Sequence, residues 1–254
     1  MAPVAIAAVW FGPPWLSALV IVAAALMAWE WARLCGEGKL GGPGILLIAG
    51  VFLSALLASA ALWREALLVA AVAALAVVMA GKLRREPSAG LAAAGVLWIA
   101  VPSVALLWLA GDPAAGRGTI FWIFAVVWAT DIGAYAVGRT VGGPRLASRV
   151  SPSKTWSGLI GGVVCAGICG FFAARLLGNP GGVLVFAVSA ALAVVAQLGD
   201  LAESAAKRRF GVKDSSGLIP GHGGLLDRLD GLLAVAPVVA LLGLLGGSSV
   251  VTWR

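Results

Sequence analysis

Long apolar runs separated by short polar connections cover almost the whole chain. Each run is roughly 15–22 residues long, about the length that an α-helix needs to cross the hydrocarbon core of a membrane. The runs are continuously apolar rather than alternating in polarity, which disfavours the strands of a transmembrane barrel. The pattern therefore predicts membrane-spanning helices. They cover residues 15–34, 44–62, 66–80, 90–110, 118–138, 156–177, 183–203 and 229–247.

Residues 1–11 are also apolar, but they are too few to cross a membrane. They lack the basic region and the cleavage site of a signal peptide. We interpret them as a short or partial first helix, such as a start site placed too late would leave. The predicted fold is an all-α, polytopic integral membrane protein of about nine transmembrane helices. We expect one integrated membrane domain, with N-terminal helices over 1–117 and a C-terminal region that carries the polar motif loops over 118–254.

The composition supports a membrane protein. Of the 254 residues, 61% are hydrophobic and 11% are charged, and the mean hydropathy is +1.02. A soluble domain of this length cannot cover its surface with so few charges. Cys165 and Cys169 lie one helical turn apart in an apolar run with no histidine nearby. We therefore interpret the cysteines, Cys35 included, as packing residues rather than as a metal site or a disulfide.

The basic residues are unevenly divided between the two sides of the predicted spans. The connections after residues 34, 80, 138 and 203 carry fourteen of the 18 lysines and arginines, and the other side carries four. The positive-inside rule places the basic side in the cytoplasm, so we expect a multi-pass protein of the inner (plasma) membrane that starts inside and ends outside. The net charge of +7 suits anionic lipids and phosphate substrates. Because the basic residues are scattered over short loops, we expect no nucleic-acid partner.

Polar residues with the potential for chemistry gather between residues 197 and 231. Four of them fall at the helical spacing i, i+3, i+4 and i+7 and form one stripe, which consists of Asp200, Glu203, Ser204 and Lys207. A basic, glycine-rich connection follows, and Asp227, Arg228 and Asp230 then open the last apolar helix. Acidic residues at two helix ends suit a hard cation that bridges to substrate phosphates. The alternative is a cluster of ion pairs that only fixes the two helix ends.

This segment resembles the signature of the phosphatidate cytidylyltransferases, also called CDP-diacylglycerol synthases. The family pattern is Ser, two residues, Lys-Arg, four residues, Lys-Asp, seven residues, His-Gly-Gly, two residues, Asp-Arg, one residue and Asp. The chain matches eleven fixed positions, which are Ser204, Lys207, Arg208, Lys213, Asp214, His222, Gly223, Gly224, Asp227, Arg228 and Asp230. Ala206 departs from the larger apolar residue that the family usually has there, at a position that we expect to be one of packing.

Further stretches extend the resemblance. Residues 131–139 (DIGAYAVGR) are similar to the family's D-x-x-A-Y-x-x-G stretch, and residues 151–158 (SPSKTWSG) are similar to S-P-x-K-T-x-E/Q-G. Ser157 replaces the acidic or amide residue that the family has in the second motif. The run at 199–204 (GDLAES) matches as well, and residues 30–34 (EWARL) resemble an amino-terminal stretch of many members.

The resemblance implies an enzyme that joins CTP to phosphatidate, forms CDP-diacylglycerol and releases pyrophosphate at the cytoplasmic face of the membrane. It implies Mg²⁺ as the cofactor, with room for a second cation, and a homodimer among membrane lipids. The implied metal ligands are Asp200 and Asp227. The implied catalytic residues are Asp200, Lys207, Arg208, Lys213, Asp214, His222, Asp227, Arg228 and Asp230. The residues implied to contact substrate are Asp131, Ser151, Lys154, Thr155, Ser204, Gly223 and Gly224.

Simpler interpretations remain open for several of these side chains. Asp227 can cap its helix, and Asp200 can form an ion pair with Lys207. Glu30 lies three residues before Arg33, so an ion pair at the helix end competes with a substrate role.

Two other functions fit part of the pattern. One is a related CTP-dependent membrane enzyme that acts on another lipid, such as a polyprenol-type kinase or a CDP-archaeol synthase. The other is a transporter, which would also bury acidic residues among many helices. The ionisable residues gather at one membrane face rather than at broken helices in the midplane, which disfavours the transporter.

Overall fold

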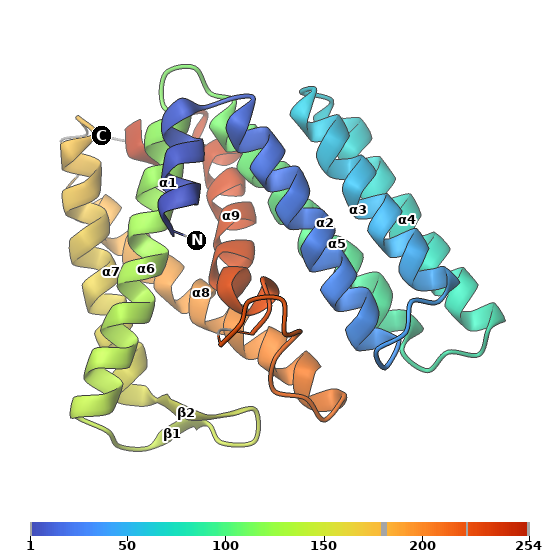
Figure 1. The fold of residues 1–254 in the computed structure, drawn as a ribbon. Coiled ribbons are helices and arrows are strands. Elements are labelled where there is room, and N and C mark those ends of the chain that lie inside the picture. The colour runs from blue at the N-terminus through green and yellow to red at the C-terminus, as the bar shows by residue number, and fades with distance from the viewer. Residues whose placement is uncertain (1, 179–181, 222, 253–254) are drawn as a thin grey trace. The chain divides into compact units, whose positions relative to one another are not determined.

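The computed structural model describes residues 2–178, 182–221 and 223–252. Over these residues the fold is all-α except for one small hairpin (Figure 1). Eight helices are long and apolar enough to cross a membrane, and a short apolar helix precedes them. The predicted all-α polytopic fold is confirmed. The helices are α1 (Ala2–Phe11), α2 (Trp15–Cys35), α3 (Gly42–Ser59), α4 (Trp63–Leu83), α5 (Ala89–Ala110), α6 (Gly116–Thr140), α7 (Trp156–Leu176), α8 (Val183–Arg209) and α9 (Leu226–Gly246), followed by a 3₁₀ turn, η1 (Val250–Thr252).

Helices α8 and α9 extend beyond their predicted apolar runs, and both extensions carry residues of the signature. Helix α8 continues to Arg209 instead of ending at residue 203, so Lys207 lies on the helix. Helix α9 begins at Leu226 instead of residue 229, which places Asp227 in its first turn. The hydrophobic pattern predicts both helices too short, because it follows only the apolar side chains, whereas the helical backbone continues through charged residues.

The connection between α6 and α7 forms an antiparallel hairpin that the hydrophobic pattern does not indicate. Strand β1 (Arg145–Ala147) pairs with β2 (Ser151–Thr155), and Arg145 lies opposite Thr155. Gly142 and Gly143 have φ angles of 67° and 107° before β1, which favours glycine at both positions. Strand β2 ends at the residue before α7. The hairpin therefore places Lys154 and Thr155, the last two residues of β2, next to the start of that helix.

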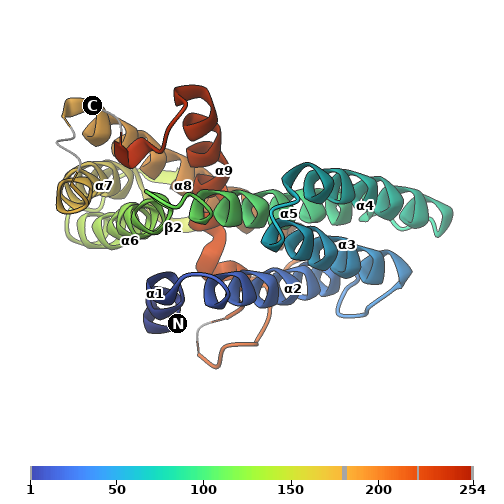
Figure 2. The ribbon, with the colours of Figure 1, turned by 90° about the horizontal axis from the view of Figure 1, so that it is seen from above.

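The chain divides into two compact units, and the first comprises Met1–Trp108 and Ala206–Leu229. In this unit α2 packs against α3, and α3 packs against α4 (Figures 1 and 2). The indole Nε1 of Trp31 donates to the Leu91 carbonyl at 3.0 Å, which joins α2 to α5. One cluster of its core consists of Ala58, Ala66, Val104 and Leu107. Small side chains such as these alanines let membrane helices approach closely.

The second unit comprises Leu109–Ala205 and Asp230–Arg254. Helices α6 and α7 lie side by side in both views (Figures 1 and 2). A Cβ atom on Gly133 would collide with Cys165, so glycine is needed for this close contact. Trp122 Nε1 also donates to the Gly170 carbonyl at 3.1 Å. Cys165 is thus a packing residue between two helices, as the sequence predicts.

Candidate active site

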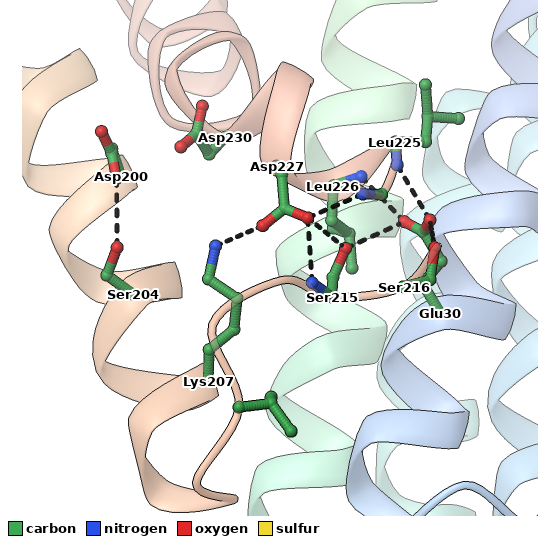
Figure 3. A network of polar contacts seen from close by, with 12 residues as sticks. Glu30, Asp200, Ser204, Lys207, Ser215, Ser216, Leu225, Leu226, Asp227 and Asp230 are labelled. Carbon is green, nitrogen blue, oxygen red and sulfur yellow. Dashed lines mark hydrogen bonds and ion pairs between the residues drawn. The ribbon is translucent and has the colours of Figure 1, made fainter. Parts of the chain in front are cut away.

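Asp227 lies in the first turn of α9 and receives hydrogen bonds from two segments of the first unit (Figure 3). Its Oδ1 forms an ion pair with Lys207 Nζ on α8, and both side chains are more than nine-tenths buried. Its Oδ2 accepts hydrogen bonds from Ser215 N at 2.9 Å, Ser215 Oγ at 2.9 Å and Gly224 N at 2.8 Å. A buried ion pair is favourable only when its remaining polar positions are also satisfied. These donors satisfy Oδ2 and hold the carboxylate in one orientation.

Glu30, a second carboxylate in this unit, is fully buried near the end of α2. Its Oε1 accepts from Ser216 Oγ at 2.5 Å and from Leu225 N at 2.8 Å, and its Oε2 accepts from Leu226 N at 2.8 Å (Figure 3). The first N–H groups of a helix have no acceptor within that helix. Glu30 therefore caps the start of α9 from a position far away in the sequence.

The sequence leaves two roles open for Glu30, an ion pair with Arg33 and a contact with substrate. In the structure both side chains make other contacts. Arg33 Nε donates to the Gly38 carbonyl at 3.2 Å, and the guanidinium lies over the Trp29 ring, 5.0 Å from its centroid. The Glu30 carboxylate contacts backbone N–H groups and hydroxyls instead. In this structure Glu30 binds Ser216 and the residues at the start of α9.

The Ser215 hydroxyl lies between these two carboxylates. Its Oγ is 2.9 Å from Asp227 Oδ2 and 3.5 Å from Glu30 Oε2. A hydroxyl has one proton to donate, and the shorter contact is with Asp227. A Cβ atom on Gly224 would collide with Ser215 Oγ and Glu30 Oε1. The structure thus explains glycine at position 224 by the close passage of the backbone beside both groups. The neighbouring Gly223 has a φ of 82°, which also favours glycine.

The other motif residues of the first unit lie at its surface. Arg208 Nη1 donates to the Val212 carbonyl at 2.8 Å and so closes the turn that ends α8. Lys213 and Asp214 in the following loop and Arg228 on α9 are exposed. His222 lies outside the described residues, so its predicted role stays a prediction.

A cavity of about 870 Å³ adjoins this loop. Trp29 and Arg33 line it from α2, and Asp214, Ser215 and Ser216 line it from the loop. Its polar lining is the Arg33 guanidinium, the carboxylates of Glu37 and Asp214 and the two serine hydroxyls, so it holds both hydrogen-bond donors and acceptors.

In the second unit, Lys154 of β2 reaches α8. Its Nζ lies 2.5 Å from Asp200 Oδ2 and 2.8 Å from Gln197 Oε1. Ser204 Oγ donates to Asp200 Oδ1 at 3.2 Å (Figure 3). The ion pair that the structure describes for Asp200 is with Lys154, and the one that it describes for Lys207 is with Asp227. The structure thus joins residues of two sequence motifs through one lysine.

Several carboxylates of this unit lie near Asp230 on α9. Asp230 is within electrostatic range of Asp131, Asp200 and Glu203, and its Oδ1 accepts a hydrogen bond from Gly231 N at 2.8 Å. Like charges repel strongly where water is scarce. A bound cation would reduce this repulsion.

Thr155 and Ser151 have structural positions in the hairpin. Thr155 Oγ1 accepts a hydrogen bond from Gly158 N at 3.1 Å and caps α7, and its side chain is buried. Such a cap stabilises a helix by about 1 kcal/mol. Ser151 opens β2 opposite Ala147. Lys154 contacts α8, whereas Thr155 lies beside Gly138 of the 131–139 motif, where a Cβ atom would come within 3.0 Å of Thr155 Oγ1.

Asp200 and Asp227 each have a carboxylate oxygen that can bind a hard cation. A carboxylate oxygen has two acceptor positions. Asp227 Oδ1 contacts Lys207, whereas Asp200 Oδ2 contacts Lys154 and Asp200 Oδ1 accepts from Ser204. Each of these oxygens keeps an acceptor position for a metal bond. Among the described residues, no three His, Cys, Asp or Glu side chains form a ready-made metal cage. Mg²⁺ is typically bound by one or two carboxylates together with substrate phosphates, so it does not need such a cage.

Sequence reasoning missed three side chains that contact the predicted residues. Ser215 and Ser216 follow the Lys-Asp pair of the signature, and Gln197 lies three residues before Asp200. A signal for Gln197 is its polar amide within an apolar run, one helical turn from a motif residue. The two serines carry no such signal, because serine is common in any loop.

The chain is similar over most of its length to known proteins. The profile of the cytidylyltransferase family matches residues 1–245. The chain is 43% identical over 239 residues to the phosphatidate cytidylyltransferase of Brucella suis, covering 92% of this chain and 86% of that protein. It is 38% identical over 232 residues to the phosphatidate cytidylyltransferase of Pseudomonas aeruginosa, covering 85% of this chain and 83% of that protein. With a match that spans both units and all the motifs described above, the chain belongs to the cytidylyltransferase family.

Proposed function

We propose that this chain is a phosphatidate cytidylyltransferase, a membrane nucleotidyltransferase that converts CTP and phosphatidate into CDP-diacylglycerol and pyrophosphate. The observation that carries the proposal is the 43% identity, over 92% of the chain, to a relative with that name. The eleven matched positions of the signature lie within the part of the chain that the family profile covers. Eight apolar helices of spanning length fit an enzyme with a lipid substrate.

The reaction is an in-line displacement at phosphorus. A phosphate oxygen of phosphatidate attacks the α-phosphorus of CTP, the bond from that phosphorus to the bridging oxygen of the β-phosphate breaks, and pyrophosphate leaves. Both substrates are anions, so the protein has to neutralise charge and align the reacting atoms. The attacking oxygen is already ionised near neutral pH, and the reaction therefore needs no strong base.

Asp200 and Asp227 are the residues that we propose to hold Mg²⁺. When bound, the ion supplies positive charge to the phosphates of both substrates and to the leaving pyrophosphate. Ser215 and Gly224 fix Asp227 Oδ2, so Oδ1 pairs with Lys207 and would be the oxygen that binds the cation. Lys154 and Ser204 orient Asp200 in the same manner. Asp230 and Asp214 support this negatively charged region, and a second cation stays a prediction.

The basic residues of the motifs are proposed to bind phosphate oxygens. They are Lys154, Lys207, Arg208, Lys213 and Arg228. Arginine suits bidentate contact with phosphate, and lysine suits a single strong contact. His222, Gly223, Asp131, Ser151 and Thr155 keep their predicted roles at the substrates.

The chain is a multi-pass membrane protein by the length and composition of its helices. We propose that it lies in the inner membrane with its motif residues at the cytoplasmic face. The support is the concentration of lysine and arginine in the connections of one side. A homodimer stays a prediction that rests on the resemblance.

Purified protein supplied with phosphatidate, Mg²⁺ and CTP labelled at one phosphate tests the reaction. Label at the α-phosphate should appear in a CDP-lipid, and label at the γ-phosphate should appear in pyrophosphate. A lipid kinase would instead transfer the γ-label to lipid and leave CDP. An ether-linked archaeol phosphate as the competing substrate separates a CDP-archaeol synthase, and a liposome flux assay without CTP tests the transporter. Absence of α-label in lipid from an otherwise folded protein would overturn the proposal.

A further inference from the structure

The contacts of Glu30 go beyond capping a helix. The residues that it contacts, Ser216, Leu225 and Leu226, belong to the loop and helix start that also hold Asp227. The Ser215 hydroxyl lies between the two carboxylates, with Oγ at 2.9 Å from Asp227 Oδ2 and 3.5 Å from Glu30 Oε2 (Figure 3). Every described hydrogen bond of the Glu30 carboxylate therefore ends on the segment that orients Asp227.

We propose that Glu30 is a positioning residue for Asp227, fixing Ser216, Leu225 and Leu226 beside it and thereby the direction of Asp227 Oδ1. This inference rests on the proposed function for its catalytic consequence. Asp227 Oδ2 depends on Ser215 N, Ser215 Oγ and Gly224 N. Those groups move together with Ser216 and Leu225, which Glu30 holds. Without Glu30 the helix start loses two of its caps, and Asp227 loses its fixed support.

The surroundings of Glu30 favour a carboxylate over an amide. Its two oxygens accept hydrogen bonds from two backbone N–H groups and from the Ser216 hydroxyl. A carboxylate accepts hydrogen bonds at both oxygens, whereas glutamine presents an NH₂ group at one of them. In Glu30→Gln that NH₂ group faces a backbone N–H or a serine hydroxyl. The start of α9 also carries a partial positive charge, which a carboxylate neutralises and an amide does not.

Glu30→Gln should loosen the start of α9 without removing side-chain volume. We expect faster hydrogen–deuterium exchange at the amides of Leu225 and Leu226, measured by mass spectrometry on the purified protein. Groups that orient a metal ligand typically change metal affinity or activity by about 10–100-fold when they are lost. We therefore expect the Mg²⁺ concentration for half-maximal rate to rise about tenfold, with a lower kcat and a smaller change in KM for CTP. Binding of Mn²⁺ alone, followed by electron paramagnetic resonance, should weaken in parallel.

Two further variants keep the test decisive. Glu65→Gln makes the same chemical change in the first turn of α4, at an exposed residue outside this network, and should leave exchange, Mn²⁺ binding and rate unchanged. Ser216→Ala removes one donor to Glu30 and has no described contact with Asp227, so it should shift the same readouts in the same direction by a smaller amount. It replaces Glu30→Gln if that variant fails to fold.

The outcomes separate the two proposals. If the wild type makes no CDP-lipid, the proposed function fails, while the exchange of Leu225 and Leu226 still tests the hold of Glu30 on α9. If the wild type is active and Glu30→Gln keeps its exchange, Mn²⁺ affinity and Mg²⁺ dependence, the positioning role is wrong. A uniform loss of active protein with an unchanged Mg²⁺ dependence would likewise reduce Glu30 to a structural residue and overturn the proposal.

Discussion

At the scale of single residues, the acidic side chains of the signature differ in how they are held. Asp227 accepts from a buried lysine and from three donors on the 215–224 segment. Asp200 pairs with Lys154 and accepts from Ser204. The Asp227–Lys207 pair is the buried one, and breaking such a pair by removing one partner costs about 3–5 kcal/mol, because the other charge is left without compensation. Substitutions at these residues therefore need a stability measurement beside the kinetic one.

Asp200→Asn and Asp227→Asn should each reduce the rate by about 100-fold or more, because each removes a proposed ligand of the cation that would stabilise the developing negative charge of the transition state. The rate should be measured at saturating Mg²⁺, together with thermal unfolding in detergent. Asp112→Asn is the matched control, because Asp112 accepts from Ala114 N and Ala115 N at a helix start and asparagine caps as well as aspartate. A wild-type rate in either motif variant would reject the metal assignment.

His222 tests whether the reaction uses a general base. If phosphatidate attacks as an ionised phosphate, His222→Asn should retain measurable turnover and keep the acidic limb of its pH–rate profile, because protonation of the lipid phosphate sets that limb. The measurement is kcat for both proteins between about pH 5 and 9. An almost inactive variant whose acidic limb is lost or moved would identify the imidazole as the base instead.

At the scale of elements, the start of α9 requires a glycine at position 224, where a side chain has no room. A Cβ atom on Gly224 would collide with Ser215 Oγ and Glu30 Oε1, so Gly224→Ala should force these groups apart and destabilise the fold by about 1–3 kcal/mol. Gly217→Ala lies in the same loop, where a Cβ atom has no neighbour within 4 Å. Thermal unfolding should therefore separate the two variants. Equal unfolding temperatures would show that the segment adapts to the added methyl group.

The hydrophobic pattern predicts the long helices because each must be apolar for the full thickness of the membrane. Predicted and observed ends agree within three residues except at the end of α8, where charged residues continue the helix to Arg209. The signature positions are also found from the sequence, because their spacing is fixed. The pattern does not reveal the hairpin before α7, whose strands are three and five residues long. It also misses the contact of Glu30 with α9, because no local pattern joins residues 195 positions apart.

At the scale of the whole molecule, the predicted orientation in the membrane is open to a direct test. In a variant without the three native cysteines, Gly217→Cys should be shielded from impermeant thiol reagents in intact cells, because its loop carries basic residues of the cytoplasmic side. Ala114→Cys, near Arg117, should be labelled. Both positions are exposed, so access across the membrane decides the result. Labelling of Gly217→Cys alone would show that the orientation in the membrane is the opposite of the predicted one.

The contact between Glu30 and the start of α9 can form only late in the synthesis of the chain. Glu30 leaves the ribosome long before its partners Leu225 and Leu226, which follow 195 and 196 residues later. Until the last helix is inserted, a carboxylate that is fully buried in the finished protein has none of these donors. A truncated or stalled chain therefore exposes a polar defect on α2 that the complete chain closes. We expect membrane quality control to recognise an unfinished chain by this exposed carboxylate.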